Sequence, residues 1–252
     1  ATHVEGTITK IIPSHTFAKN EYVNMEADLQ IKNYDGDHYY MWDAEKQYWE
    51  GYEWWSTNKK QPVLHGNQGL VYARNRTDSR YYNEYYPGSG ISNPATHTSC
   101  KNLPNANEMS WYVIYGDPRW DHDELWTTMG HLHKGGMWFK KKSVLQSEGK
   151  YDIDKSADGI TDLRTSYHNY RNTSLKHSLP SPSDANKYCF LPDLGRYYAG
   201  MLSLANEDSY YWSSSAVPWT NGMAYCLSFV YSEVRVTYDT REAGFRVKPM
   251  LE

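Results

Sequence analysis

The sequence YYWSSSAVPWTNGMAYCLSFVYSEVRVTYDTREAGFRVKP, residues 210–249, decides the fold. Side chains alternate along it with the period of two that is typical of β-strands. Tyr225, Leu227, Phe229, Val234 and Val236 fall on one side, and Cys226, Ser228, Glu233, Arg235 and Thr237 fall on the other. The pattern predicts antiparallel hairpins that bury the first set and expose the second.

A helix is predicted upstream of these hairpins, over residues 105–116. Asn105 suits the N-cap position, and Glu108 follows three residues later, as in a capping box. Gly116 is a suitable residue to end the helix.

The rest of the chain indicates short strands, turns and long connections. Residues 34–55 combine tyrosines and tryptophans with acidic residues and predict short strands and turns. An apolar strand is expected over Ile8–Ile12. A surface loop is expected over Tyr81–Pro87, either as a contact loop or as a cover packed on the body. We expect residues 150–187 to be an insertion or connector.

The composition excludes several classes of protein. The chain has 252 residues, of which 22% are charged, with a net charge of −4 and with 24 Tyr against 5 Phe. Disordered chains are poor in aromatic residues, and a protein that binds nucleic acid without regard to sequence needs a basic surface. No apolar run reaches the roughly 18 residues that a membrane-spanning helix needs. We therefore expect no nucleic-acid partner and no membrane span.

Candidate catalytic and metal-binding residues do not form a known pattern. Asp121–Glu124 with His131 and His133 is the richest cluster, but its spacing matches neither a zinc site nor an EF-hand. Cys226 has no recognisable base beside it. A glycosidase carboxylate pair is an open alternative, with the aromatic block at residues 39–55 as its sugar platform. We expect no metal and no cofactor.

Several motifs resemble one known family. They are Leu103-Pro104 with Glu108, Trp111 and Gly116, then FLPDLG at 190–195, YWSSS at 211–215, AYCLSF at 224–229 and REAGFRV at 241–247. Together they resemble the formylglycine-generating-enzyme-like branch of the C-type-lectin-like fold, and surface proteins of gut anaerobes of the Bacteroides type. The block YDGDHYYMWD at 34–43 is similar to the N-terminal part of relatives in this group.

The resemblance implies an α+β, C-type-lectin-like fold with twisted antiparallel sheets, one or two main helices and long loops. We expect a single domain over residues 1–252. Within it, 1–100 would supply N-terminal strands and loops, 101–188 a helix and an insertion, and 189–252 the hairpins that display the ligand contacts. The enzyme of this branch uses a cysteine pair, whereas Cys226 stands alone in its region here.

The resemblance and the residues together predict a non-enzymatic ligand-binding protein at the bacterial cell surface. It is similar to pilus-tip adhesins and to the variable proteins of diversity-generating retroelements, and its partner would be a host or bacterial surface protein or a glycan. The predicted contacts mix aromatic and short polar side chains, as binding surfaces do: Val217, Trp219, Thr220, Asn221, Cys226, Ser228, Tyr231, Ser232, Glu233, Arg235, Thr237, Tyr238, Asp239 and Thr240. The alternatives are an enzyme, of the formylglycine-generating type or carbohydrate-active, and a structural pilus subunit that contacts other surface subunits.

Overall fold

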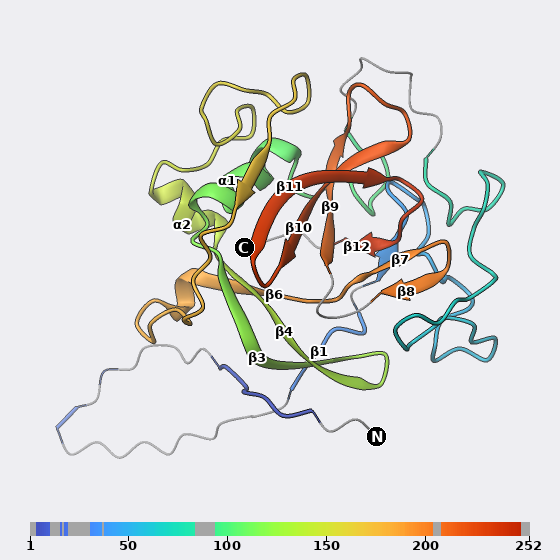
Figure 1. Cartoon of the computed structure of the whole chain (residues 1–252), viewed down its shortest axis with the longest axis horizontal. Helices are drawn as coiled ribbons and strands as arrows, with labels where there is room; N and C mark the ends of the chain where they lie inside the picture. Colours follow the sequence, from blue (N-terminus) through green and yellow to red (C-terminus); the bar gives the residue numbers. More distant parts are fainter. Residues whose placement is uncertain are drawn as a thin grey trace.

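A six-stranded sheet forms the centre of the computed structural model, which describes residues 4–10, 16, 18–19, 31–36, 38–83, 94–203 and 208–247 (Figure 1). Its strand order is β2-β12-β9-β10-β11-β5. The strands are β2 (Tyr39–Tyr40), β5 (Tyr170–Asn172), β9 (Ser209–Ala216), β10 (Met223–Val230), β11 (Glu233–Thr240) and β12 (Phe245–Arg246). The predicted C-terminal hairpins therefore form, and the sheet also includes β2 from the first half of the chain and β5 from the expected connector at 150–187.

The hairpin of β10 and β11 is regular along its whole length. Its register runs from Met223 opposite Thr240 to Val230 opposite Glu233. Only two residues connect the strands, which is the commonest length for a tight hairpin. The two ends of this hairpin are therefore about 24 Å apart, at about 3.4 Å per residue.

A second, four-stranded sheet has the order β1-β3-β4-β6. Its strands are β1 (Lys32–Asn33), β3 (Arg119–Thr128), β4 (His131–Lys140) and β6 (Tyr188–Pro192). The chain then forms the small hairpin of β7 (Arg196–Tyr198) and β8 (Met201–Ser203). The class of the structure is α+β and rich in sheet, as expected.

The helix α1 (Ala106–Tyr115) begins and ends where the sequence predicts. The Asn105 side chain accepts a hydrogen bond from the Glu108 backbone N–H, and the Glu108 carboxylate accepts one from the Asn105 backbone N–H. The helix packs against β5, β9, β10 and β11. Two shorter helices follow, α2 (Lys142–Ser147) and the 3-10 helix η1 (Ala185–Lys187).

The central sheet is buried on both faces at β9 and β10. On one face Tyr225, Leu227 and Phe229 pack into a core with α1 and the second sheet, as predicted. On the other face Cys226 packs into a separate core with Trp42 and other side chains. The predicted exposure of this second face is wrong for β10, because residues distant in sequence cover it. No helix among the described residues is long and apolar enough to cross a bilayer.

Two expectations fall partly outside the described residues. The predicted strand Ile8–Ile12 includes residues 11 and 12, which lie outside, and Thr7 forms a parallel bridge with Glu124. The predicted loop Tyr81–Pro87 is described only as far as residue 83. Tyr81 is buried, which agrees with the alternative of a cover packed on the body, and its hydroxyl donates to the Glu242 carboxylate at 2.6 Å.

Candidate functional site

The predicted contact residues lie at two opposite ends of the β10–β11 hairpin. Trp219, Thr220 and Asn221 belong to the β9–β10 connection, beside the end of β11 that carries Tyr238, Asp239 and Thr240. Tyr231, Ser232 and Glu233 lie at the two-residue turn of the hairpin. One compact site cannot include both groups.

Three of the predicted contact residues are buried, so the prediction is wrong for them. Cys226 and Ser228 point into the face of β10 that lies under the core around Trp42, and Val217 packs into the core beside α1. Burial raises the pKa of the Cys226 thiol well above its usual value. The buried thiol is therefore neither a contact for a ligand nor a reactive thiolate.

The polar residues Glu233, Arg235, Thr237 and Asp239 of β11 face the side of the sheet opposite Tyr238, and its charged side chains form ion pairs. Glu233 accepts from Arg235, at 3.0 Å, and from Arg171, at 2.6 Å. Asp239 accepts from Arg196 at 2.9 Å. Thr237 lies between them, half-buried. This row forms a partly covered ionic surface, apart from the exposed aromatic residues.

Four aromatic rings converge at the other end of the hairpin, and we call Tyr167, Trp219, Tyr225 and Tyr238 the aromatic platform. The Trp219 ring is at their centre, 5.8 Å from the Tyr167 ring and 6.2 Å from each of the other two, and all three contacts are edge-to-face. Tyr225 and Tyr238 also meet edge-to-face at 6.2 Å. Edge-to-face rings attract one another beyond their area of contact, so the platform is held in a fixed arrangement.

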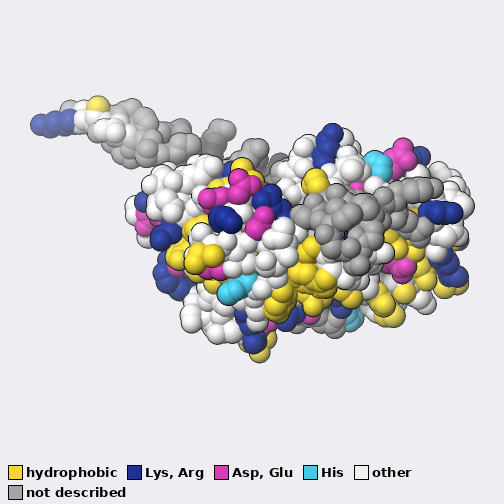
Figure 2. Space-filling view, turned by 90° about the horizontal axis from the view of Figure 1, so that it is seen from above, with side chains coloured by type: hydrophobic (Ala, Val, Ile, Leu, Met, Phe, Trp, Pro, Cys, Tyr) yellow, Lys and Arg dark blue, Asp and Glu magenta, His cyan; other side chains and the backbone are white. Residues whose placement is uncertain are grey.

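The platform remains open to solvent. Tyr167 is 62% exposed, Trp219 39% and Tyr238 37%, whereas Tyr225 is buried beneath them. Figure 2 looks down onto the end of the molecule where the β9–β10 connection lies in Figure 1, and hydrophobic side chains gather in the middle of that face. Exposed aromatic residues that lie together, with short polar residues such as Thr220 and Asn221 beside them, are typical of binding surfaces.

Tyr167 is the member of the platform that the sequence analysis missed. It lies in the polar connector before β5, where no periodic pattern indicates its position. The Tyr225 hydroxyl donates to the Leu163 backbone carbonyl at 2.9 Å and so ties this connector to the sheet. That buried bond brings Tyr167 to Trp219.

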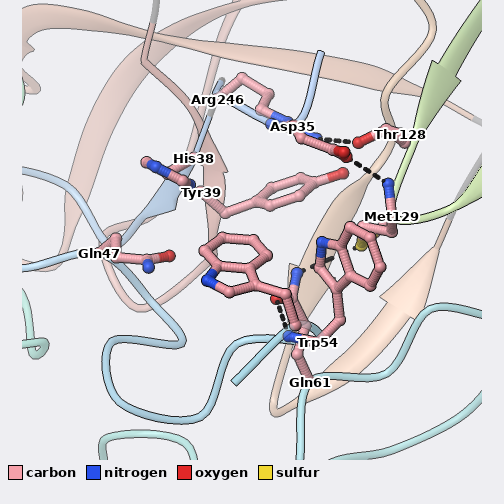
Figure 3. A pocket seen from close by; sticks show the side chains of 10 residues that line it. Asp35, His38, Tyr39, Gln47, Trp54, Gln61, Thr128, Met129 and Arg246 are labelled. Atoms are coloured by element: carbon pink, nitrogen blue, oxygen red, sulfur yellow. Dashed lines mark hydrogen bonds between the residues drawn. The ribbon is translucent and has the colours of Figure 1, made fainter. Parts of the chain in front are cut away.

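A narrow pocket lies where the two sheets meet, around the buried Arg246. The Arg246 guanidinium stacks 3.9 Å from the centre of the Tyr39 ring and donates to Thr128 Oγ1 at 3.4 Å. Figure 3 shows Asp35 beside these groups, with Trp54 across Tyr39 from them. The cavity measures about 10 Å³, which is at most the room for one water molecule. The pocket is therefore a packed junction of the core.

The aromatic block at residues 39–55 does not form a sugar platform. Tyr39, Trp42, Tyr48 and Trp49 are buried, and their rings pack within the cores. Trp55 is exposed, and its ring contacts the rings of Trp54 and His38. Most side chains of this block therefore fill the cores, which weighs against the alternative of a sugar platform here.

The acidic and histidine cluster forms structural contacts. The Asp121 carboxylate accepts from the Trp138 indole at 3.0 Å and from the backbone N–H of Asp123 at 2.9 Å. Burial lowers the pKa of His133 to about 4, because desolvation disfavours its charged form. Within the described ranges, no group of three or more His, Cys, Asp or Glu is placed to hold a metal ion. All three cysteines are free.

Comparisons of this chain with protein-family models, with curated proteins and with solved structures gave no match.

Proposed function

We propose that this chain is a non-enzymatic ligand-binding protein of the bacterial surface, with a C-type-lectin-like fold. Its ligand would be a surface protein or a glycan, held at the aromatic platform. The observation that carries the proposal is the convergence of Tyr167, Trp219 and Tyr238 from three separate segments into one exposed cluster.

The arrangement of the elements is compatible with the lectin-like fold. A capped helix packs against an antiparallel sheet made from the last strands of the chain, and long connections join the elements. In such a fold a rigid scaffold presents loops for binding. The REAGFRV motif supports the scaffold: Arg241 is buried and stacks 4.7 Å from the centre of the Trp42 ring.

The chemistry around the platform favours binding over catalysis. Trp219 and Tyr238 offer rigid rings with polar edges, and no acid, base and nucleophile converge on them among the described residues. The buried Cys226 thiol does not supply the thiolate that a thiol-dependent enzyme needs. A half-exposed cluster of aromatic rings suits the apolar face of a sugar ring or an apolar side chain of a protein.

The test is a binding screen with matched variants. The protein is applied to a printed array of mammalian and bacterial glycans, to intact mucin, and to mucin whose glycans periodate has oxidised. We expect binding that Tyr167→Ala and Trp219→Ala remove and that Tyr231→Ala, at the far end of the hairpin, leaves intact. If periodate treatment of mucin abolishes binding, the ligand is a glycan. If binding is retained after periodate, the ligand is the polypeptide of mucin.

If Tyr167→Ala and Trp219→Ala bind every probe as the parent protein does, the ligand binds elsewhere and the proposal is overturned. Turnover of a substrate that depends on one of the buried cysteines would favour the enzyme alternative.

A further inference from the structure

A second hollow lies away from the aromatic platform, between the β7–β8 hairpin and residues 72–74. It has a volume of about 250 Å³, and its walls include Met41, Tyr72, Arg74, Tyr198 and Glu242. None of the platform's residues lines it. The REAGFRV motif supplies Glu242, which lies in the connection between β11 and β12.

The volume of the hollow suits a small molecule. A protein cavity of about 150 Å³ is known to hold benzene. The larger volume here gives room for a six-membered ring together with its polar substituents. Most small-molecule sites likewise combine aromatic walls with a few fixed polar groups.

The two charged groups of the hollow are held in place and do not neutralise each other. The Glu242 carboxylate accepts from the Tyr81 hydroxyl at 2.6 Å. The Arg74 guanidinium stacks 4.9 Å from the centre of the Tyr72 ring. No ion pair joins Arg74 to Glu242 among the described residues, so each keeps hydrogen-bonding capacity for a ligand.

The rim of the hollow is a rigid turn. Ala199 and Gly200 both have positive φ, 48° and 77°, as in a type I′ hairpin. The Gln68 side-chain amide donates to the Ala199 carbonyl at 2.8 Å, and a Cβ on Gly200 would lie 2.1 Å from the Gly69 carbonyl oxygen. This close packing holds the neighbouring Tyr198, which is 53% exposed, beside the hollow.

We propose that this hollow binds a single uncharged pyranose. The Tyr198 ring would cover the apolar C–H face of the sugar, because the negative face of an aromatic ring attracts weakly positive hydrogens. Glu242 would accept hydrogen bonds from hydroxyl groups, and Arg74 would donate to hydroxyl oxygens. An uncharged sugar suits the site, because its hydroxyl groups can donate hydrogen bonds to Glu242 and accept them from Arg74 without an unpaired charge.

The experiment uses the methyl pyranosides of glucose, galactose, mannose, fucose and N-acetylglucosamine as probes. Saturation-transfer NMR and titration calorimetry on the whole chain should show binding of at least one, with a Kd of about 1 mM for a ligand of this size. Glu242→Gln keeps an acceptor for Tyr81 but loses the charge, and should weaken binding about tenfold. Tyr198→Ala should weaken it at least as much, and Tyr231→Ala should leave it unchanged.

The outcomes separate this site from the aromatic platform. Tyr167→Ala should abolish binding of the platform's ligand and retain the pyranoside. The proposal is overturned if none of the five pyranosides shows saturation transfer. It is also overturned if a pyranoside signal is lost in Tyr167→Ala but kept in Glu242→Gln. Binding of a zwitterion such as free phenylalanine, in place of the sugars, would also overturn it.

Discussion

Truncation of Tyr167 is the perturbation that best separates a binding role from a structural one. The side chain is 62% exposed, and Tyr231, at the other end of the β10–β11 hairpin, is 60% exposed. A tyrosine side chain covers about 200 Å², so a ligand on the platform can bury about 120 Å² of Tyr167. At about 25 cal/mol per Å² this area corresponds to at most about 3 kcal/mol of binding free energy.

The expected result for Tyr167→Ala is a loss of affinity of ten- to a hundredfold, because about 1.4 kcal/mol changes Kd tenfold. Tyr231→Ala should leave the Kd unchanged. Both variants remove a similar buried area and should each lower the free energy of unfolding by no more than about 2 kcal/mol. Biolayer interferometry on the immobilised ligand gives the Kd, and urea unfolding gives the stability.

The comparison of Tyr167→Ala with Tyr231→Ala also gives the results that would refute binding at the aromatic platform. Equal loss of affinity in the two variants would show that the binding surface is not the platform. Unchanged affinity in both would show that the platform's exposed rings do not touch the ligand.

Four further predictions concern the scaffold. Asn105→Ala removes the N-cap of α1 and should lower the free energy of unfolding by about 1 kcal/mol, seen as a fall of about 2–4 °C in Tm by calorimetry; an unchanged Tm would contradict the role of the cap. His133 has a folded pKa of about 4, below its unfolded value of about 6.5, so its neutral form stabilises the fold above pH 6.5 and this contribution is lost as the pH falls toward 4. The free energy of unfolding, measured with urea, should be lower at pH 5 than at pH 7, and this difference should be smaller in His133→Gln; an equal difference in both proteins would refute the assignment of the pH dependence to His133. The Cys226 thiol should react with Ellman's reagent only after denaturation, while the partly exposed Cys189 reacts first; rapid reaction of all three thiols in the native protein would show that the core is open. Gly200→Ala should lower Tm by several degrees, since its Cβ would meet the Gly69 carbonyl oxygen, and a Tm equal to that of the parent would contradict the packing of the β7–β8 turn.

Local signals in the sequence predicted the elements whose stability is local. The capping box of Asn105 and Glu108 places both ends of α1, because its hydrogen bonds join residues three apart. The alternation in β10 and β11 gives the strands and their core face, because side chains alternate between the two faces of any strand. Trp219 and Tyr238 were predicted as contacts and are exposed, since they lie in a connection and at the end of a strand.

The burial of Cys226 and Ser228 could not be predicted from alternation. The alternation of side chains along a strand shows that its two faces differ, but it does not show whether another part of the chain covers the second face. Here Trp42 covers it from far away in sequence, and its indole donates to the Ser213 carbonyl at 2.9 Å. Tyr167 escaped prediction for the same reason, because long-range hydrogen bonds place its connector, among them those of Leu163 with Tyr225 and Asn107.

The most direct test of the central claim is ¹⁹F NMR of the protein labelled with 5-fluorotryptophan, titrated with the ligand that the binding screen identifies. The Trp219 resonance is assigned from the Trp219→Phe variant. We predict that the Trp219 resonance shifts on binding while that of the buried Trp212 stays in place. A saturable titration that leaves Trp219 unmoved would contradict the claim that the aromatic platform holds the ligand.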